Sequence, residues 1–356
     1  MRLEECLEQI FPVDAEAGKR VQEHLNALAK PLHGLGRLED MLIQIGDIRR
    51  TEKFSIHKRA LIVMCADNGV VEEGVTQTDS SVTTIVANNF ARGMTSVCLM
   101  AKTAGVDVIP VDIGVKEDTV IRQEKIARGT KNMVKGSAMT REETVRAIET
   151  GICLAEECAE RGYEILLTGE MGIGNTTTSS AVTAVLLGKE PETVTGRGAG
   201  LSDEGLKRKY RAIKTAIERN APNAEDPLDV LAKVGGLDIA GMTGVFLGGA
   251  ALNLPVIIDG YISAAAALVA ARLCPEVKGY MLSSHQSKEP GMKGILEELE
   301  QHPFLDCQMS LGEGTGAVSL IPLLDLAMSV YEGMETFAEV EIEAYEELGG
   351  RSECLQ

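Results

Sequence analysis

The sequence contains no tryptophan, and aromatic residues make up only 3% of its 356 residues. Hydrophobic residues nevertheless account for 44% of the chain, so the core must be aliphatic, built from Leu, Ile, Val, Ala and Met. This amount suffices for one large domain, with or without a small second one. Glycine is common, with 37 residues, as in proteins that have many tight turns between strands and helices.

Positive charge is scarce. The chain has 35 Lys and Arg against 53 Asp and Glu, a formal net charge of −18. Such a surface disfavours nucleic acid or an anionic membrane as partner, although a few local donors can still bind a small anion. No apolar run is long enough to span a bilayer, and the N-terminal MRLEECLEQIF has no signal-peptide pattern. We expect a soluble, cytoplasmic protein.

The sequence also lacks any C-x-x-C pair or clustered histidines. Its cysteines are at positions 6, 65, 98, 153, 158, 274, 307 and 354, and its histidines at 24, 33, 57, 285 and 302. Most of the cysteines lie in apolar runs, which indicates reduced core residues rather than disulfides or zinc ligands. We therefore predict no metal site.

Helical periodicity marks both ends of the chain. Residues 1–54 contain three apolar patterns of helical spacing, and residues 318–348 contain another that ends in a Glu-rich run. We predict that residues 1–54 and 318–356 form a small helical domain.

The central region, residues 55–317, has a different pattern. Short apolar runs lie at 60–65, 106–111, 163–168, 254–259, 278–283 and 304–311. Most precede a loop rich in Gly, Ser, Asp or His and then an Ala-rich helical stretch, which predicts βα units. The expected fold class is α/β, with an open, doubly wound, mainly parallel sheet. Ligands of such sheets bind at the carboxyl ends of the strands.

Two glycine-rich loops are candidate anion sites. In the first, Gly172 and Gly174 permit close backbone approach, and Asn175 and Thr176 are candidate helix caps. It matches neither the Walker A pattern nor a dinucleotide fingerprint, and a capped helix with turn glycines explains it equally well. The second loop contains Gly198 and precedes a helix that carries Lys209, where a solvated basic helix face is the alternative.

Carboxylates follow several predicted strands. Glu170, in GEMG, and Glu313, in GEGTG, have glycine neighbours. Apolar surroundings would move the pKa of such a carboxyl towards that of a useful base, although each could simply accept backbone hydrogen bonds in its loop. Asp67 is expected mainly to cap a turn. His285 ends another predicted strand and either binds ligand or stabilises its loop.

Taken together, these loops resemble the nicotinate-nucleotide:dimethylbenzimidazole phosphoribosyltransferase family. The matching stretches run in order from Lys30 to Ala317: Lys30-Pro31 with GLGRLE at 34–39, VMCADNGV, GEMGIGNTT, KVGGLDIAGMTGV, SSHQSKEPG and LGEGTGA. The resemblance covers nearly the whole chain, and GEMGIGNTT and LGEGTGA are its most specific motifs.

The resemblance implies a homodimer that needs no cofactor and transfers phosphoribose from nicotinate mononucleotide to a benzimidazole-type base. In the family, the glutamate that matches Glu313 is the general base, and Glu170 matches a second active-site carboxylate. The implied phosphate and nucleotide residues are Gly172, Gly174, Asn175, Thr176, Gly198 and Lys209. The implied base-binding residues are Thr78, Val86, Ile173 and Leu311.

Two positions depart from the family pattern. Asn68 stands where a His is common, and Val86 where a Gln is common. Val86 removes a polar group from the expected base pocket, so the accepted base stays open among benzimidazoles, purines and phenolics.

Three other functions are weighed against this one. A dinucleotide-dependent oxidoreductase would need a glycine fingerprint after the first strand, which residues 65–75 lack. A non-catalytic nucleotide-binding protein would use the glycine loops only as a cradle. A phosphoribosyltransferase with a diphosphate donor and Mg²⁺ is faintly suggested by the run that ends at Asp259, but the second acid and the phosphate loop of that class are missing.

Overall fold

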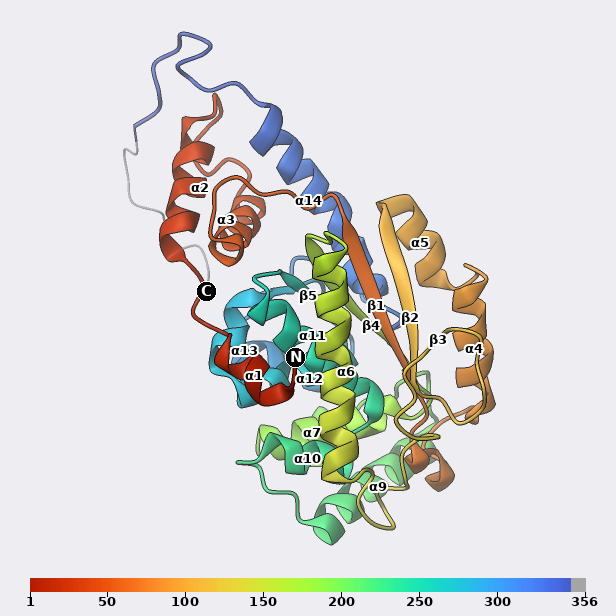
Figure 1. Ribbon diagram of the computed structural model, residues 1–356. Helices are drawn as coiled ribbons and strands as arrows, with labels where there is room; N and C mark the ends of the chain where they lie inside the picture. The colour runs from red at the N-terminus through yellow and green to blue at the C-terminus, as the bar shows by residue number, and fades with distance from the viewer. Residues whose placement is uncertain (347–356) are drawn as a thin grey trace. The chain divides into compact units, whose positions relative to one another are not determined.

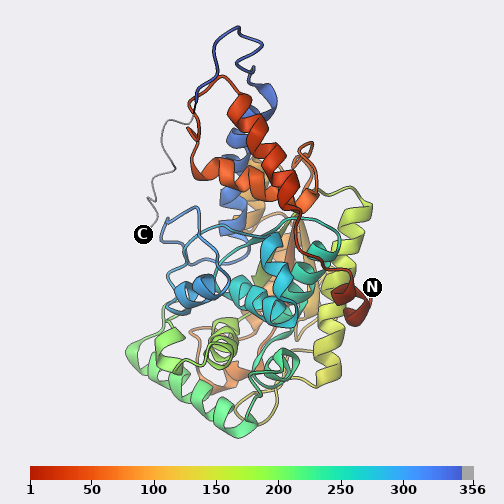
Figure 2. The same cartoon turned by 90° about the vertical axis from the view of Figure 1, so that its left-hand side faces the viewer.

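The computed structural model describes residues 1–346 and divides into two compact units (Figures 1 and 2). The larger comprises Met1–Pro12 and Ser55–Leu320, and the smaller comprises Val13–Phe54 and, within the described residues, 321–346. Residues 1–12 thus belong to the larger unit, whereas the sequence analysis grouped them with the small domain. Their short helix buries Leu3 and Cys6. The N-terminal amino group binds Glu156 at 2.6 Å.

In the described chain, six strands form one parallel sheet in the larger unit. The strands are β1 (Arg59–Ala66), β2 (Val106–Gly114), β3 (Arg122–Gln123), β4 (Ile165–Met171), β5 (Val256–Ile258) and β6 (Met281–Ser283). Their order is β3-β2-β1-β4-β5-β6, and every neighbouring pair is parallel. The predicted open, parallel, doubly wound sheet is confirmed.

Five of the six predicted strands are present, and one is wrong. Residues 304–311 form only an isolated bridge between Leu305 and His285. The segment contains Asp306, Cys307 and Gln308, which are exposed or nearly so, and it lacks the two buried faces that a strand inside a parallel sheet requires. The sixth strand is instead β3, whose two residues are too few to produce a hydrophobic pattern.

Helices of the larger unit cover both faces of the sheet. The α-helices of the two units together, within the described residues, are α1 (Leu3–Glu8), α2 (Ala15–Ala27), α3 (Arg37–Arg49), α4 (Ser81–Ala91), α5 (Ser96–Ala104), α6 (Arg141–Glu160), α7 (Asn175–Leu186), α8 (Pro191–Val194), α9 (Asp203–Asn220), α10 (Pro227–Val234), α11 (Leu237–Ala251), α12 (Tyr261–Leu273), α13 (Gly291–Glu298) and α14 (Thr315–Gly333). Two 3₁₀ helices, η1 (Gly69–Glu73) and η2 (Pro275–Tyr280), complete the described helical segments. Helix α11 packs on β1, β2, β4 and β5, while α4 and α5 lie on the other side of β1 and β2 (Figure 1).

Glycines allow α6 and α11 to lie in direct backbone contact. A Cβ on Gly244 would fall 1.9 Å from the carbonyl oxygen of Ile148, and one on Gly151 would fall 2.0 Å from that of Gly241. Any larger residue at these positions would force the helices apart. The glycine-rich run at 235–249 is therefore explained mainly by helix packing under the sheet.

The smaller unit contains α2, α3 and the later part of α14. Helices are present where the periodicity near the two chain ends predicts them, but the last is shorter than expected. Helix α14 ends at Gly333, and residues 334–346 contain no helix, so the prediction of helix across this stretch is wrong. This segment is mostly exposed and Glu-rich, which leaves it without an apolar face to bury. Residues 347 and 348 of that prediction lie outside the described residues.

No helix in residues 1–346 is long and apolar enough to cross a membrane. All seven cysteines of this range are free thiols. Cys6, Cys65, Cys158 and Cys274 are buried, whereas Cys153 and Cys307 are exposed. The prediction of core cysteines thus holds for four of them, and Cys354 lies beyond the described part.

Candidate active site

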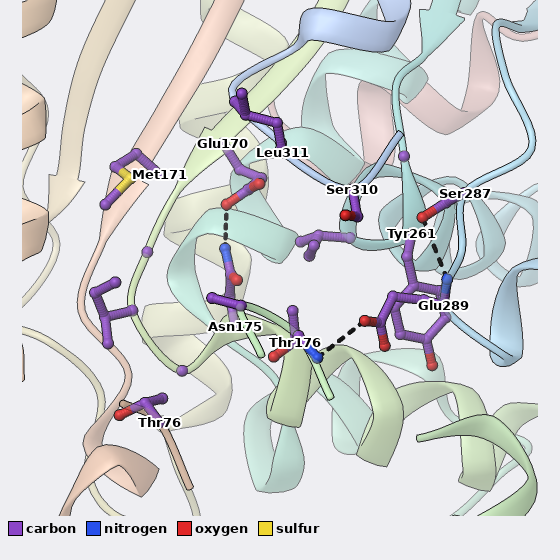
Figure 3. A pocket seen from close by; sticks show the side chains of 18 of the residues that line it. Thr76, Glu170, Met171, Asn175, Thr176, Tyr261, Ser287, Glu289, Ser310 and Leu311 are labelled. Carbon is purple, nitrogen blue, oxygen red and sulfur yellow. Dashed lines mark hydrogen bonds between the residues drawn. The ribbon is translucent and has the colours of Figure 1, made fainter. Parts of the chain in front are cut away.

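A cavity of about 290 Å³ opens at the carboxyl end of the sheet in the larger unit (Figure 3). Its walls come from the ends of β4, β5 and β6 and from the loops at 75–78, 197–201 and 310–313. The strand order reverses direction between β1 and β4, and open α/β sheets bind ligands beside this switch point. The cavity therefore lies where the fold places a ligand.

Glu313 occupies an unusual backbone conformation at the cavity wall. Gly312, Glu313 and Gly314 have φ values of 89°, 62° and 93°, three left-handed residues in a row. This conformation is strained for a residue with a side chain, and such strain is common at functional sites. The two glycines adopt it without penalty, which explains why they flank the carboxylate.

The Glu313 carboxylate is half-buried at the start of α5. Its Oε2 atom accepts a hydrogen bond from the backbone N–H of Val97 at 3.1 Å. Burial raises the pKa of Glu313, while the bonds from Val97 and the Thr95 hydroxyl act in the opposite direction. The carboxyl is thus oriented by α5 and tuned towards the strength of a useful base.

Glu170 lies against the Glu313 loop and contacts it closely. A Cβ on Gly312 would fall 2.4 Å from Glu170 Oε1, and one on Gly169 would fall 2.6 Å from the carbonyl oxygen of Glu313. Only glycine at both positions permits this approach. The structure therefore brings together the two carboxylates that the sequence analysis selected.

Asn175 links Glu170 to a second buried acid that the sequence analysis missed, Asp238. The Asn175 amide donates to Glu170 and, at 3.0 Å, to Asp238 Oδ2 (Figure 3 shows the Glu170 contact). Burial raises the pKa of Glu170 to about 8, with repulsion from Asp238 adding to it, and burial raises the pKa of Asp238 to about 6. At neutral pH Glu170 is thus mainly protonated, and a bound cation would favour its ionised form.

The glycine-rich loops form a second wall with donors for an anion. Gly172, Gly174, Thr176 and Gly198 line the cavity, and Gly198 N–H donates to Glu289 at 3.0 Å. In Figure 3 the dashed line from the Glu289 carboxylate to the nitrogen beside Thr176 marks this bond. Glycine-rich loops that enter a helix typically offer such N–H groups to an anion.

Lys209 lies behind this wall and does not itself line the cavity. It is fully buried, and its Nζ atom donates to Thr176 Oγ1 at 2.9 Å and to the Gly196 carbonyl at 3.0 Å. Burial lowers the pKa of Lys209 to about 8. The negative charge of Glu289 acts in the opposite direction and raises this pKa. An anion bound beside Thr176 would stabilise the protonated, charged form of Lys209.

Of the predicted base-binding residues, Thr78, Ile173 and Leu311 line the cavity, but Val86 does not. Val86 is half-buried on α4, and it is Thr83 of that helix that contacts the site, accepting a hydrogen bond from Ile173 N–H at 3.1 Å. The family resemblance placed this helix at the pocket. It did not show which face of α4 is turned inward.

Asp67 and His285, whose roles the sequence left open, lie in different places. His285 lines the cavity and is buried, whereas Asp67 lines a neighbouring polar hollow and accepts a hydrogen bond from Lys116 N–H at 2.8 Å. Asp67 therefore holds the loop after β2 rather than a turn of its own. Within residues 1–346, no group of three or more Asp, Glu, His or Cys side chains is arranged to hold a metal ion.

Comparison with known proteins identifies the family. A family model described as "Phosphoribosyltransferase" matches residues 10–342. The nicotinate-nucleotide–dimethylbenzimidazole phosphoribosyltransferase of Acetivibrio thermocellus is 48% identical over 96% of this chain and 98% of its own length. The chain belongs to this family. The enzyme of the same name from Ruminiclostridium cellulolyticum is 47% identical over 98% of this chain and all of the relative.

Solved structures of the family have the same fold. The crystal structure of CobT from Thermus thermophilus is 37% identical and superposes with a TM-score of 0.88, covering 93% of this chain and all of that one. The resemblance drawn from the motifs is thereby confirmed, as are the fold class and the assignment as an enzyme of the phosphoribosyltransferase type.

Several acids and hydroxyls that line this family member's cavity were not selected as site residues from the sequence. They are Tyr261, Ser287, Glu289, Ser310 and Asp259, the last of which was weighed only as a sign of a diphosphate donor. Asp259, Ser287 and Glu289 stand in the loops after β5 and β6, and the rule that strand-end loops bind ligands would have selected them. Asp238 offered no such signal, because it lies in the first turn of α11 and not in a loop after a strand; it reaches the site through Asn175 and beside Gly172.

Proposed function

We propose that this enzyme transfers phosphoribose from nicotinate mononucleotide to 5,6-dimethylbenzimidazole or a closely related azole. The products are free nicotinate and an α-ribosyl phosphate, which place the reaction in cobalamin nucleotide-loop assembly. The observation that carries the proposal is Glu313, an oriented carboxylate with a raised pKa at the cavity wall. The names of the relatives support the choice of substrates.

The chemistry requires one base. As an azole nitrogen attacks C1′ of the ribose, the other ring nitrogen loses its proton to the Glu313 carboxylate. The C1′–nicotinate bond breaks, and its electron pair returns to the pyridinium nitrogen, so the ring nitrogen becomes neutral and its departure needs no acid. Direct displacement inverts the β linkage to α.

Glu170 makes the second contribution to catalysis. Positive charge develops at C1′ while both rings are partly bonded, and an ionised carboxylate beside it stabilises that charge. The cationic pyridinium of the bound mononucleotide also favours ionisation of Glu170, whose pKa without ligand is raised to about 8. We assign Glu170 to the ribose side, with Thr78, Ile173 and Leu311 beside the azole.

The phosphate is assigned to the wall formed by Gly172, Thr176 and Gly198, with Lys209 behind it. Lys209→Met should raise KM for nicotinate mononucleotide about 10- to 100-fold, with a smaller change in kcat, because Thr176 loses its hydrogen bond from a charged donor and the phosphate loses a nearby positive charge. Steady-state kinetics against mononucleotide concentration measures both constants. Lys207→Met is the matched control, because Lys207 is exposed on the same helix. Equal KM values for the two variants would contradict the assignment.

Asp259 argues against the diphosphate-donor alternative. Both of its carboxylate oxygens accept backbone N–H groups of the Glu313 loop. They are therefore already engaged, and the residue that suggested that class has a different role.

Assembly and compartment belong to the same proposal. We assign a homodimer, supported by Ile85, Met94 and Leu99, which are about 60% exposed on or beside α4 and α5. A mass of one chain by light scattering would contradict it.

A cytoplasmic location fits the free thiols of the described range, since disulfides are rare in that compartment.

Product analysis tests the proposed function. The protein is mixed with nicotinate mononucleotide and 5,6-dimethylbenzimidazole, and the mixture is separated by liquid chromatography. We expect equal amounts of nicotinate and an α-ribosyl phosphate of the azole. Nucleotide binding without nicotinate release, for any azole offered, would favour a non-catalytic binding protein.

A further inference from the structure

Helix α14 begins directly after Gly314 and has no capping side chain of its own. Gly314 stands at the N-cap position, since its carbonyl accepts the N–H of Val318 at 3.0 Å. An N-cap Ser, Thr, Asp or Asn would accept the N–H groups two or three residues later, and glycine has no group to do so.

The cap is supplied by Asp259, at the end of β5, which precedes Gly314 by 55 residues in the chain. Its Oδ1 atom accepts the N–H groups of Gly316 at 2.7 Å and Ala317 at 3.0 Å, and its Oδ2 atom accepts that of Gly314 at 3.2 Å. The side chain is 3% exposed. A carboxylate at this point also gains from the positive end of the helix dipole.

Asp259 is itself held rigidly. Its backbone N–H donates to Ser263 Oγ at 3.1 Å, and Ser263 Oγ lies 2.6 Å from Thr168 Oγ1 on β4. Its carbonyl accepts from Ser284 Oγ at 3.0 Å, at the end of β6. The backbone of Asp259 is thus tied to β4 and to the end of β6, and its carboxylate relates their position to the α14 N-terminus.

His285 packs against the same segment. A Cβ on Gly316 would fall 1.9 Å from His285 Nδ1 and 2.9 Å from Asp259 Oδ1. Gly316 is therefore packed closely against both side chains, and no larger residue fits there. Glu313 lies shortly before Gly316 in the chain, and its left-handed backbone needs support from its surroundings to persist.

We propose that Asp259 is the positioning residue for Glu313: by capping α14 from β5 it holds the general base at the azole. This inference rests on the proposed function. It predicts that Asp259 contributes to kcat through Glu313 alone and contributes little to binding of nicotinate mononucleotide.

The test is a double-mutant cycle of Asp259→Asn and Glu313→Gln with nicotinate mononucleotide and 5,6-dimethylbenzimidazole. The asparagine side chain keeps the shape, but it has one acceptor oxygen for three donors. Asp259→Asn alone should lower kcat about 100-fold, the effect of a misplacement of about 1 Å, with KM for the mononucleotide changed less than about twofold. On the Glu313→Gln background it should lower kcat by less than about threefold.

Asp226→Asn is the matched control. Asp226 caps α10 by accepting the N–H groups of Leu228 and Asp229, and it does not line the cavity. We expect wild-type kinetics from this variant. A full 100-fold effect of Asp259→Asn on the Glu313→Gln background, or an unchanged kcat in Asp259→Asn alone, would overturn the proposal.

Hydrogen exchange gives a readout independent of catalysis. Asp259→Asn should speed amide exchange in a peptide that spans residues 312–318, and unchanged exchange there would refute the capping role. If wild-type protein makes no product, the proposed function fails, while the exchange experiment still decides whether Asp259 holds the loop. Gly316→Ala displaces the loop from His285 and Asp259 and should reproduce the kcat loss if Asp259→Asn does not fold.

Discussion

Glu313→Gln should lower kcat about 100- to 10,000-fold, the range expected for loss of a general base, while KM for nicotinate mononucleotide changes little. Glutamine keeps the shape and can still accept the Val97 N–H bond, so the loop conformation should survive. What it lacks is the capacity to take the azole proton. Initial rates of nicotinate release at saturating azole measure the effect.

Circular dichroism and thermal unfolding should show the same fold and nearly the same Tm for Glu313→Gln as for wild type. Glu192→Gln, an exposed carboxylate on α8, is the control for the loss of one negative charge. A Glu313→Gln enzyme that retains more than about a tenth of wild-type kcat would remove Glu313 from the role of base.

Glu170→Gln should lower kcat about 100-fold, because a neutral amide stabilises the positive charge at C1′ much less than a carboxylate does. Asn175 can still donate to the glutamine oxygen, so the cavity should keep its geometry. The same kinetic assay measures the loss. A variant with normal kcat and a raised KM would show that Glu170 acts only in binding the cationic pyridinium ring of the nucleotide.

The raised pKa of Glu170 also predicts a pH dependence of binding. The pKa is about 8 without ligand and falls when the pyridinium cation binds, so binding near pH 7 releases a proton. Affinity for nicotinate mononucleotide should therefore rise with pH up to about 8 and then level off. Titration calorimetry near neutral pH, in two buffers of different ionisation enthalpy, measures the number of protons released on binding.

The Glu170→Gln variant should lose this proton release, and its affinity should vary less with pH than that of wild type. Comparison of the two proteins subtracts any proton that the nucleotide's own phosphate takes up or gives off. Equal proton release from both would place the titrating group elsewhere, with Asp238 the next candidate because its pKa is raised to about 6.

The sequence by itself was sufficient for the features that depend on short stretches of chain. Buried strands are read from short runs of consecutive apolar residues, and the loop around Glu313 from its flanking glycines, because these patterns follow from local steric limits. The strand predicted at 304–311 failed because its apolar residues do not face a core, and the two-residue β3 is too short to produce a pattern.

Only the tertiary structure decided which distant residues meet. Asp238 joins Glu170 through Asn175, Thr83 rather than Val86 faces Ile173, and Asp259 caps a helix that starts far along the chain at Thr315. The pKa of Glu170 likewise depends on burial and on a charge from another element. Local sequence constrains backbone conformation, whereas desolvation and long-range hydrogen bonds arise only when remote elements pack together.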